Sequence, residues 1–501
     1  MAAWCSFCRR TGGSTASARP RYVEFRSSKV FIVSVVTVAV FTDIFLYGLI
    51  VPVTPTALEE RVGLPPEDRQ RWTSILLALY GAALLASSPI FGYMADKMAS
   101  RQWSLIAGLV ALGAATSLFC AGTSLGLWIA GRIFQGLSAA VVWTVGLALL
   151  VDTVAEDELG AAMGFMGMGL SAGTVLGPLV AGVVYQRAGY YAVFAVAFAL
   201  IGVDIVLRLI MIEKKDAQKW LSTTEETASS EQQSTHQITK DGEGQSGSYA
   251  AAPTPEKSAE MPREEPQESP SKRRLPATLI LLSNRRMMVA LYAYLAISIV
   301  MTSFESVLPL FVQGLFGWEQ IGQGLIFIPL LLPHFLEPLI GLVIDRYQNS
   351  VRFLAAGAFF FATPVYVLLR FVTDDSIRHK VLLCALLALI GLGYATILPS
   401  LMTEVSYIIN SIEEESPNVF GPGGAVAQGY GIFNSAFAAG SLVGPVWGGF
   451  IRDRYGWGTM SWSLGLLSGV TAVLVLLTLG GWIGNVKKRP TSGESRHVDA
   501  A

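Results

Sequence analysis

The feature that most constrains this chain is a series of apolar segments that are each long enough to cross a lipid bilayer. A membrane-spanning helix needs about 20 apolar residues. Twelve such runs lie near residues 30–53, 72–95, 103–122, 125–151, 159–185, 190–212, 287–313, 321–344, 351–372, 380–408, 425–450 and 459–484. Lipid cannot hydrogen-bond the backbone, and the alternating segments of about ten residues that are typical of membrane strands are absent. We therefore expect an all-α membrane protein.

The composition agrees with this expectation. Of the 501 residues, 52% are hydrophobic and only 15% are charged, whereas soluble domains carry about 25% charged residues. The net charge of −1 favours no charged partner, and no nucleic acid is expected to bind.

Two short patterns occur twice and in the same order. Residues 177–182 in the fifth run recur as residues 444–449 in the eleventh run, 267 positions later. The pattern that ends the second run at Asp96 recurs at the end of the eighth run at Asp345, 249 positions later. A duplicated half predicts two six-helix bundles related by pseudo-twofold symmetry, with a transport site between them.

The placement of basic residues predicts the topology. They gather before the first run, between the sixth and seventh runs and after the last run, which places both termini and the central loop in the cytoplasm. The central loop is too polar to bury a core. The expected organisation is a disordered tail 1–29, an N-terminal bundle 30–213, a disordered linker 214–286, a C-terminal bundle 287–485 and a tail 486–501.

Ionisable residues within the apolar runs are candidates for substrate and proton binding. Each costs about 2.5–3.5 kcal/mol at the membrane centre, so each indicates a cavity or a partner. The candidates are Asp43, Arg132, Glu305, His334, Glu337 and Glu404. Asp43 and Glu305 fall in the matching first runs of the two halves, where two acids facing a cavity would attract a cation. His334 and Glu337 are three residues apart and could relay protons or form a hydrogen-bonded structural pair.

Two further sets of residues indicate conformational roles. Acids and cations at the ends of the second and eighth runs predict a latch between the bundles, although ordinary charged helix ends would look similar. The latch candidates are Gly92, Asp96, Lys97, Arg101, Asp345 and Arg346. Small residues and a proline in the fifth run predict either a bend that governs access or a close packing face. These are Gly169, Gly173, Gly177, Pro178 and Gly182.

The motifs resemble those of the major facilitator superfamily, and in particular its twelve-span drug:proton antiporters. Residues 92–101 are similar to the motif of the loop between spans two and three, and residues 132–136 to the fourth-span motif with its buried arginine. Residues 173–182 are similar to the fifth-span antiporter motif. The resemblance covers both halves and implies alternating access.

Within that family, the chain is similar to the vesicular amine transporter branch. Asp43 lies where that branch has an acid that pairs with the substrate amine, and Glu404 lies near its tenth-span acid. Asn434 replaces the eleventh-span acid that is central to proton coupling there. The resemblance therefore implies either that coupling here uses Glu404, Glu305 or Glu337, or that the substrate is not a simple monoamine. The acidic stretch 410–424, expected to be a long cytoplasmic loop, looks fungal.

These observations predict a proton-coupled exporter of a small organic compound, such as a drug, an amine or a secondary metabolite. Its partners would be a cationic or aromatic substrate, protons and the bilayer, and it would act as a monomer in the plasma membrane or in a vacuolar or vesicular membrane. We expect no cofactor, no metal and no enzymatic activity, because no phosphate-binding loop or metal-ligand spacing is present. A uniporter or proton symporter is the first alternative, and a non-transporting receptor or scaffold is the second.

Overall fold

The computed structural model describes residues 22–220 and 276–480, except residues 99, 219, 319, 348, 349 and 422. The predicted tails and most of the predicted linker, together with Cys5 and Cys8, lie outside the described residues.

The chain divides into two compact units. One comprises residues 1–31 and 212–273, and the other comprises residues 32–211 and 274–501. Within the described part of the first unit, the short helix α2 (Val23–Arg26) ends in a hydrogen bond from the Ile212 N–H to the Arg26 carbonyl, at 3.1 Å. The predicted tail therefore includes a short ordered element.

The second unit contains the apolar helices. Its N-terminal half comprises α3 (Lys29–Glu60), α4 (Pro66–Lys97), α5 (Arg101–Ala121), α6 (Leu125–Thr153), η1 (Glu156–Glu158), α7 (Leu159–Ala188) and α8 (Tyr190–Ile210). Its C-terminal half comprises α10 (Ala277–Ser283), α11 (Arg285–Phe316), α12 (Gln320–Leu325), α13 (Phe327–Leu331), η2 (Leu332–Leu336), α14 (Glu337–Arg346), α15 (Ser350–Leu368), η3 (Leu369–Phe371), α16 (Ile377–Glu415), α17 (Val426–Tyr455) and α18 (Trp457–Thr478).

All regular elements in the described residues are helical, which confirms the predicted all-α class. Eleven candidate spans are long and apolar enough to cross a membrane. The helix α17 occupies the place of the eleventh predicted span but is not among these candidates, because its glycines and polar residues such as Asn434 lower its mean hydropathy.

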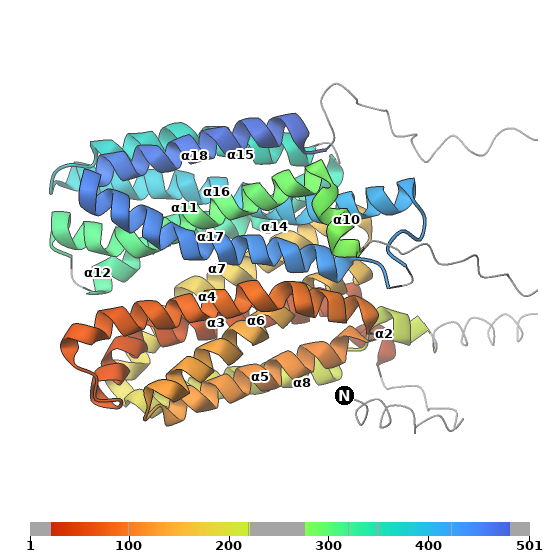
Figure 1. Ribbon diagram of the computed structural model, residues 1–501, viewed down its shortest axis with the longest axis horizontal. Coiled ribbons are helices and arrows are strands. Elements are labelled where there is room, and N and C mark those ends of the chain that lie inside the picture. Colours follow the sequence, from red (N-terminus) through yellow and green to blue (C-terminus); the bar gives the residue numbers. More distant parts are fainter. Residues whose placement is uncertain are drawn as a thin grey trace, which may run out of the picture. The chain divides into compact units, whose positions relative to one another are not determined.

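Two pairs of helices form the largest contacts between the two halves of the second unit. Figure 1 shows α3–α8 in red to yellow and α11–α18 in green to blue, with α4 beside α17. The other pair is α7 against α14. Since α4 corresponds to α14 and α7 to α17 in the sequence repeat, the two interfaces are equivalent by pseudosymmetry.

The eighth predicted span is broken, although the sequence predicted one continuous helix over 321–344. It consists of α12, α13, the 3-10 turn η2 and α14. Pro329, Pro333 and Pro338 lack the N–H that an uninterrupted helix requires. A 3-10 stretch inside a membrane helix often marks a hinge or a functional site.

The long loop expected at 410–424 is shorter than predicted. α16 continues to Glu415, so the helix absorbs the first part of that stretch. The side-chain amide of Asn410 donates a hydrogen bond to the Glu156 carboxylate of the other half. The extended part of α16 therefore contacts the N-terminal half through Asn410.

Candidate functional site

The carboxylate of Asp96 connects the end of α4 with the first turn of α17. It accepts hydrogen bonds from the backbone N–H groups of Ala427 and Gln428, each at 2.9 Å, and from the Gln428 side chain at 3.3 Å. Arg101 lies 3.6 Å from Asp96 and 2.8 Å from Asp152. The free N–H groups and the positive dipole end of a helix favour such an anion.

Asp345 makes the equivalent contact between α14 and α7. Its carboxylate accepts from the N–H groups of Gly160 at 2.6 Å and Ala161 at 2.8 Å. A Cβ added to Gly92 or to Gly341 would meet backbone atoms of the facing helix. Both interfaces therefore close at the end that carries Asp96 and Asp345, which we call the latch end.

The three predicted latch cations have different surroundings. Arg101 belongs to the Asp96 cluster, whereas the Lys97 ammonium bonds the Tyr93 hydroxyl of its own helix. Arg346 is exposed. The latch acids, rather than these two cations, make the contacts between the halves.

Asp43 is buried in the N-terminal half, with the Arg208 guanidinium within electrostatic range of its carboxylate. Its side chain is 1% exposed, and neither carboxylate oxygen has a hydrogen-bond partner among the described residues. Trp143 adjoins the carboxylate, and Tyr80 lies within electrostatic range of it. A buried carboxylate without partners is costly, so this position suits a proton or a cationic group.

Arg132 lies nearby in α6. Its guanidinium donates to the Gln135 side chain at 3.0 Å and lies 5.7 Å from the centroid of the Tyr47 ring. Two of its nitrogens have no hydrogen-bond partner in the described part of the chain. The rings of Tyr47 and Tyr80 are 4.6 Å apart. Aromatic rings thus connect the region of Asp43 with that of Arg132.

Glu305 occupies a solvent-accessible position inside the bundle. It is exposed, yet it lies within electrostatic range of Tyr47 in the other half and of Tyr394 in α16. The exposed Glu305 side chain thus lies within electrostatic range of tyrosines from both halves. Glu305 is thus close to Tyr47, whose ring contacts Tyr80 near Asp43.

His334 and Glu337 form a separate buried pair in the broken span. Both are 0% exposed, and His334 Nδ1 is hydrogen-bonded to Glu337 Oε1. Their other polar atoms, His334 Nε2 and Glu337 Oε2, have no partner in the described region. Glu337 also opens α14, where the helix dipole favours a carboxylate.

Glu404 lies apart from these groups. Its carboxylate accepts from Arg286 at 2.8 Å and from the Gly480 N–H at 2.9 Å, so it joins the start of α11 to the end of α18. Asn434 donates to the Ser88 hydroxyl at 2.8 Å. Both residues therefore bond to neighbouring helices in this conformation.

The predicted antiporter glycines face α3. A Cβ at Gly173 would lie 2.9 Å from the Phe41 carbonyl oxygen, and Gly169 and Gly177 are similarly close to backbone atoms of α3. Pro178 packs against Gly48, whereas nothing lies within 4 Å of a Cβ at Gly182. Sequence reasoning missed a second face of α7, formed by Gly160, Gly164 and Gly167, which packs on α14. The 267-residue offset could have revealed this face, because it relates Gly160 to Ala427 at the other interface.

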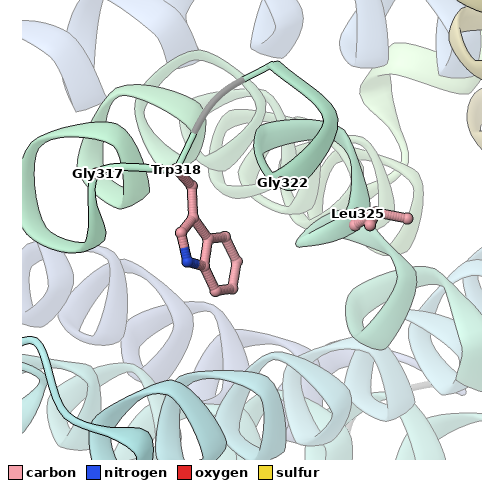
Figure 2. A pocket seen from close by; sticks show the side chains of 4 residues that line it. All are labelled: Gly317, Trp318, Gly322 and Leu325. Atoms are coloured by element: carbon pink, nitrogen blue, oxygen red, sulfur yellow. The ribbon is translucent and has the colours of Figure 1, made fainter.

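A surface cavity of about 530 Å³ lies at the opposite end of α11 from Arg286. It is lined by Gly317, Trp318, Gly322 and Leu325, and Figure 2 shows the Trp318 ring extending into it. The cavity lies between α11 and α12, away from the latch end.

Comparisons with known proteins agree with this arrangement. The sequence pattern of the Major Facilitator Superfamily matches residues 36–414. An uncharacterized MFS-type transporter of Schizosaccharomyces pombe is 32% identical over 451 residues, which cover 89% of this chain and 95% of that protein. The MFS-type transporter ppzB of Metarhizium rileyi is 30% identical over 482 residues, which cover 92% and 97%.

Two more distant similarities add detail. The probable vesicular acetylcholine transporter-B of Danio rerio is 29% identical over 183 residues, which cover 36% of this chain and 37% of that protein. The crystal structure of the human organic anion transporter MFSD10 superposes with a TM-score of 0.58 at 15% identity, covering 89% of this chain and 99% of that one. At this identity the structural likeness concerns the fold alone.

Proposed function

The chain belongs to the major facilitator superfamily of membrane transporters, as predicted, and we propose that it exports a small organic compound in exchange for protons. The observation that carries this proposal is the pair of acids Asp43 and Glu305. Asp43 is buried and accepts no hydrogen bond from the described residues, and Glu305 is exposed within electrostatic range of both halves. Such acids suit the binding of cationic groups and protons in turn.

The aromatic side chains around these acids favour an aromatic or cationic substrate. Tyr47 and Tyr80 are in contact, and Trp143 adjoins Asp43. Aromatic faces attract cations within about 6 Å of the ring centroid. We place substrate binding between Asp43 and Glu305, with Arg132 as a fixed positive charge beside it.

The latch provides the conformational part of the proposal. With the basic loops in the cytoplasm, the latch end is cytoplasmic, and the conformation described here is closed toward the cytoplasm. Alternating access requires the Asp96 and Asp345 contacts to break while contacts at the other end form. The relatives with transporter names support the transport class without identifying the substrate.

Purified protein in liposomes tests the antiport, with ethidium as an aromatic cationic probe. We expect ethidium movement to follow an imposed pH gradient and to be lost in Glu305→Gln, while the exposed Glu415→Gln behaves as wild type. Movement that is indifferent to the gradient would contradict antiport and favour a facilitative uniporter.

A further inference from the structure

The two interfaces between the halves carry equivalent residues at equivalent positions. The 249-residue offset relates Ser88 to Glu337, and the 267-residue offset relates Asn434 to Gly167. The contacts follow the same relation, because Asn434 meets Ser88 in one interface and Gly167 meets Glu337 in the other. Differences between the interfaces can therefore be compared residue by residue.

The chemistry differs at this one pair of positions. Ser88 and Asn434 are neutral and share a hydrogen bond of 2.8 Å. In the other interface, Glu337 Oε2 occupies the space that a Cβ at position 167 would fill. The missing side chain of Gly167 therefore leaves room for the Glu337 carboxylate, and Gly167 supplies no side-chain hydrogen bond to it. One interface thus holds a neutral pair and the other holds an acid, which stands at the position equivalent to Ser88.

The Glu337 pair is sealed while α7 and α14 are in contact. Both members are 0% exposed, and each has one polar atom without a hydrogen-bond partner among the residues that the structure describes. Burying a net charge costs far more than burying a neutral pair. With one proton added, the pair is a neutral ion pair or two neutral groups, and without that proton it carries one negative charge. The closed interface thus selects the protonated pair.

The surrounding groups are few. On its own span, the pair consists of His334 and Glu337. From α16, the Tyr394 ring lies 6.4 Å from the His334 ring, and from α11, Tyr294 lies within electrostatic range of Glu337. Helix α7 presents Gly164 and Gly167 to Glu337. No neighbouring cation among these described contacts neutralises the carboxylate in place of His334.

A tyrosine of α16 lies near both the buried pair and Glu305. Tyr394 lies beside His334 and within electrostatic range of Glu305. Glu305 is the accessible acid between the halves. Tyr394 is therefore near both the buried pair and Glu305.

We propose that His334 and Glu337 bind and release the transported proton, and that Gly167 controls when they do so. While α7 and α14 are in contact, a proton enters from the side of Glu305 and neutralises the pair, which stabilises the closed interface. When the two helices separate, the same proton leaves to water at the latch end and the pair becomes negative again. This inference rests on the proposed antiport and assigns its coupling site.

A pH titration without any substrate tests this inference. Spin labels replace the exposed Ala155 and Tyr347 at the latch end, in full-length protein whose four native cysteines are changed to serine. Electron–electron distances are recorded in lipid nanodiscs across the pH range in which imidazoles and buried carboxylates titrate. We expect the closed-to-open ratio to fall as pH rises, by up to tenfold per pH unit, the limit for one linked proton.

Three variants decide the assignment. Glu337→Gln is expected to stay closed at every pH. The double variant Gly167→Asn with Glu337→Ser installs the neutral pair of the other interface and is expected to fold, close and ignore pH. Ser88→Ala, the matched change in the other interface, is expected to keep the wild-type pH response.

Two results would overturn the proposal. One is a wild-type distance distribution that does not change with pH, and the other is a wild-type response in both Glu337 variants. Because no substrate is present, this titration is independent of the ethidium assay. A normal titration without gradient-driven transport would refute the antiport and leave the proton site in place.

Discussion

Replacement of Asp96 by Asn tests the latch most directly. The Asp96 carboxylate accepts three hydrogen bonds from Ala427 and Gln428 and lies 3.6 Å from Arg101. Asn has nearly the same shape but only one acceptor oxygen. Its NH₂ group would face a backbone N–H of α17, so one buried donor would lose its partner.

The magnitude follows from these contacts. A hydrogen bond to a charged group contributes about 1.5–3 kcal/mol, and an unsatisfied buried donor costs about 1–3 kcal/mol. We take about 3 kcal/mol as the net loss of latch free energy for Asp96→Asn. Since each 1.4 kcal/mol is a factor of about ten, the closed-to-open ratio should fall about 100-fold.

Spin labels at Met98 and Ser416, which are both exposed, measure this ratio through the distance across the latch end. Asp345→Asn serves as the matched comparison, because Asp345 accepts two backbone hydrogen bonds and no arginine contact to it is described. We expect its effect to be smaller than that of Asp96→Asn. An unchanged distribution in Asp96→Asn, or a larger effect of Asp345→Asn, would refute this reasoning.

Three other predictions concern packing and pairing. Arg286→Ala removes the ion-pair partner of the buried Glu404 and leaves it the more distant charge of Arg352. We therefore expect the thermal midpoint to fall with a stability loss of about 3 kcal/mol, the lower end of the range for a broken buried pair; an unchanged midpoint would contradict a structural role for the pair. Gly173→Ala should lower the free energy of unfolding by about 1–3 kcal/mol through contact with α3. Gly182→Ala, with open space around the added Cβ, should have the thermal midpoint of wild type. Equal midpoints of the two variants would show that α3 adapts. Asn434→Ala should remove about 1 kcal/mol of latch-end closure, and distance measurements should show a fall of about fivefold in the closed-to-open ratio.

The sequence was sufficient for the helices and for the equivalence of the halves. Apolar runs of bilayer length must satisfy their own backbone groups, so helix formation depends on each segment alone. The repeat offsets then relate Asp96 to Asp345 without knowledge of any contact. The break in the eighth span could also have been predicted from the sequence, since this span contains three prolines within ten residues.

The tertiary structure decided which partner each buried polar group has. Glu404 pairs with Arg286, which is 118 residues away, and Asn434 pairs with Ser88, which is 346 residues away. Such choices depend on which helices are neighbours and on how they are rotated. Hydrophobicity along the chain does not record either property.

The pair of Glu337 and Gly167 combines both kinds of information. The sequence determined that an acid stands in a proline-rich span and that a glycine stands in the span related to the one with Asn434. Only the packing of α7 on α14 showed that the carboxylate occupies the space that this glycine leaves. A missing side chain has no signature of its own in a sequence, because its effect arises from the atom of another helix that takes its place.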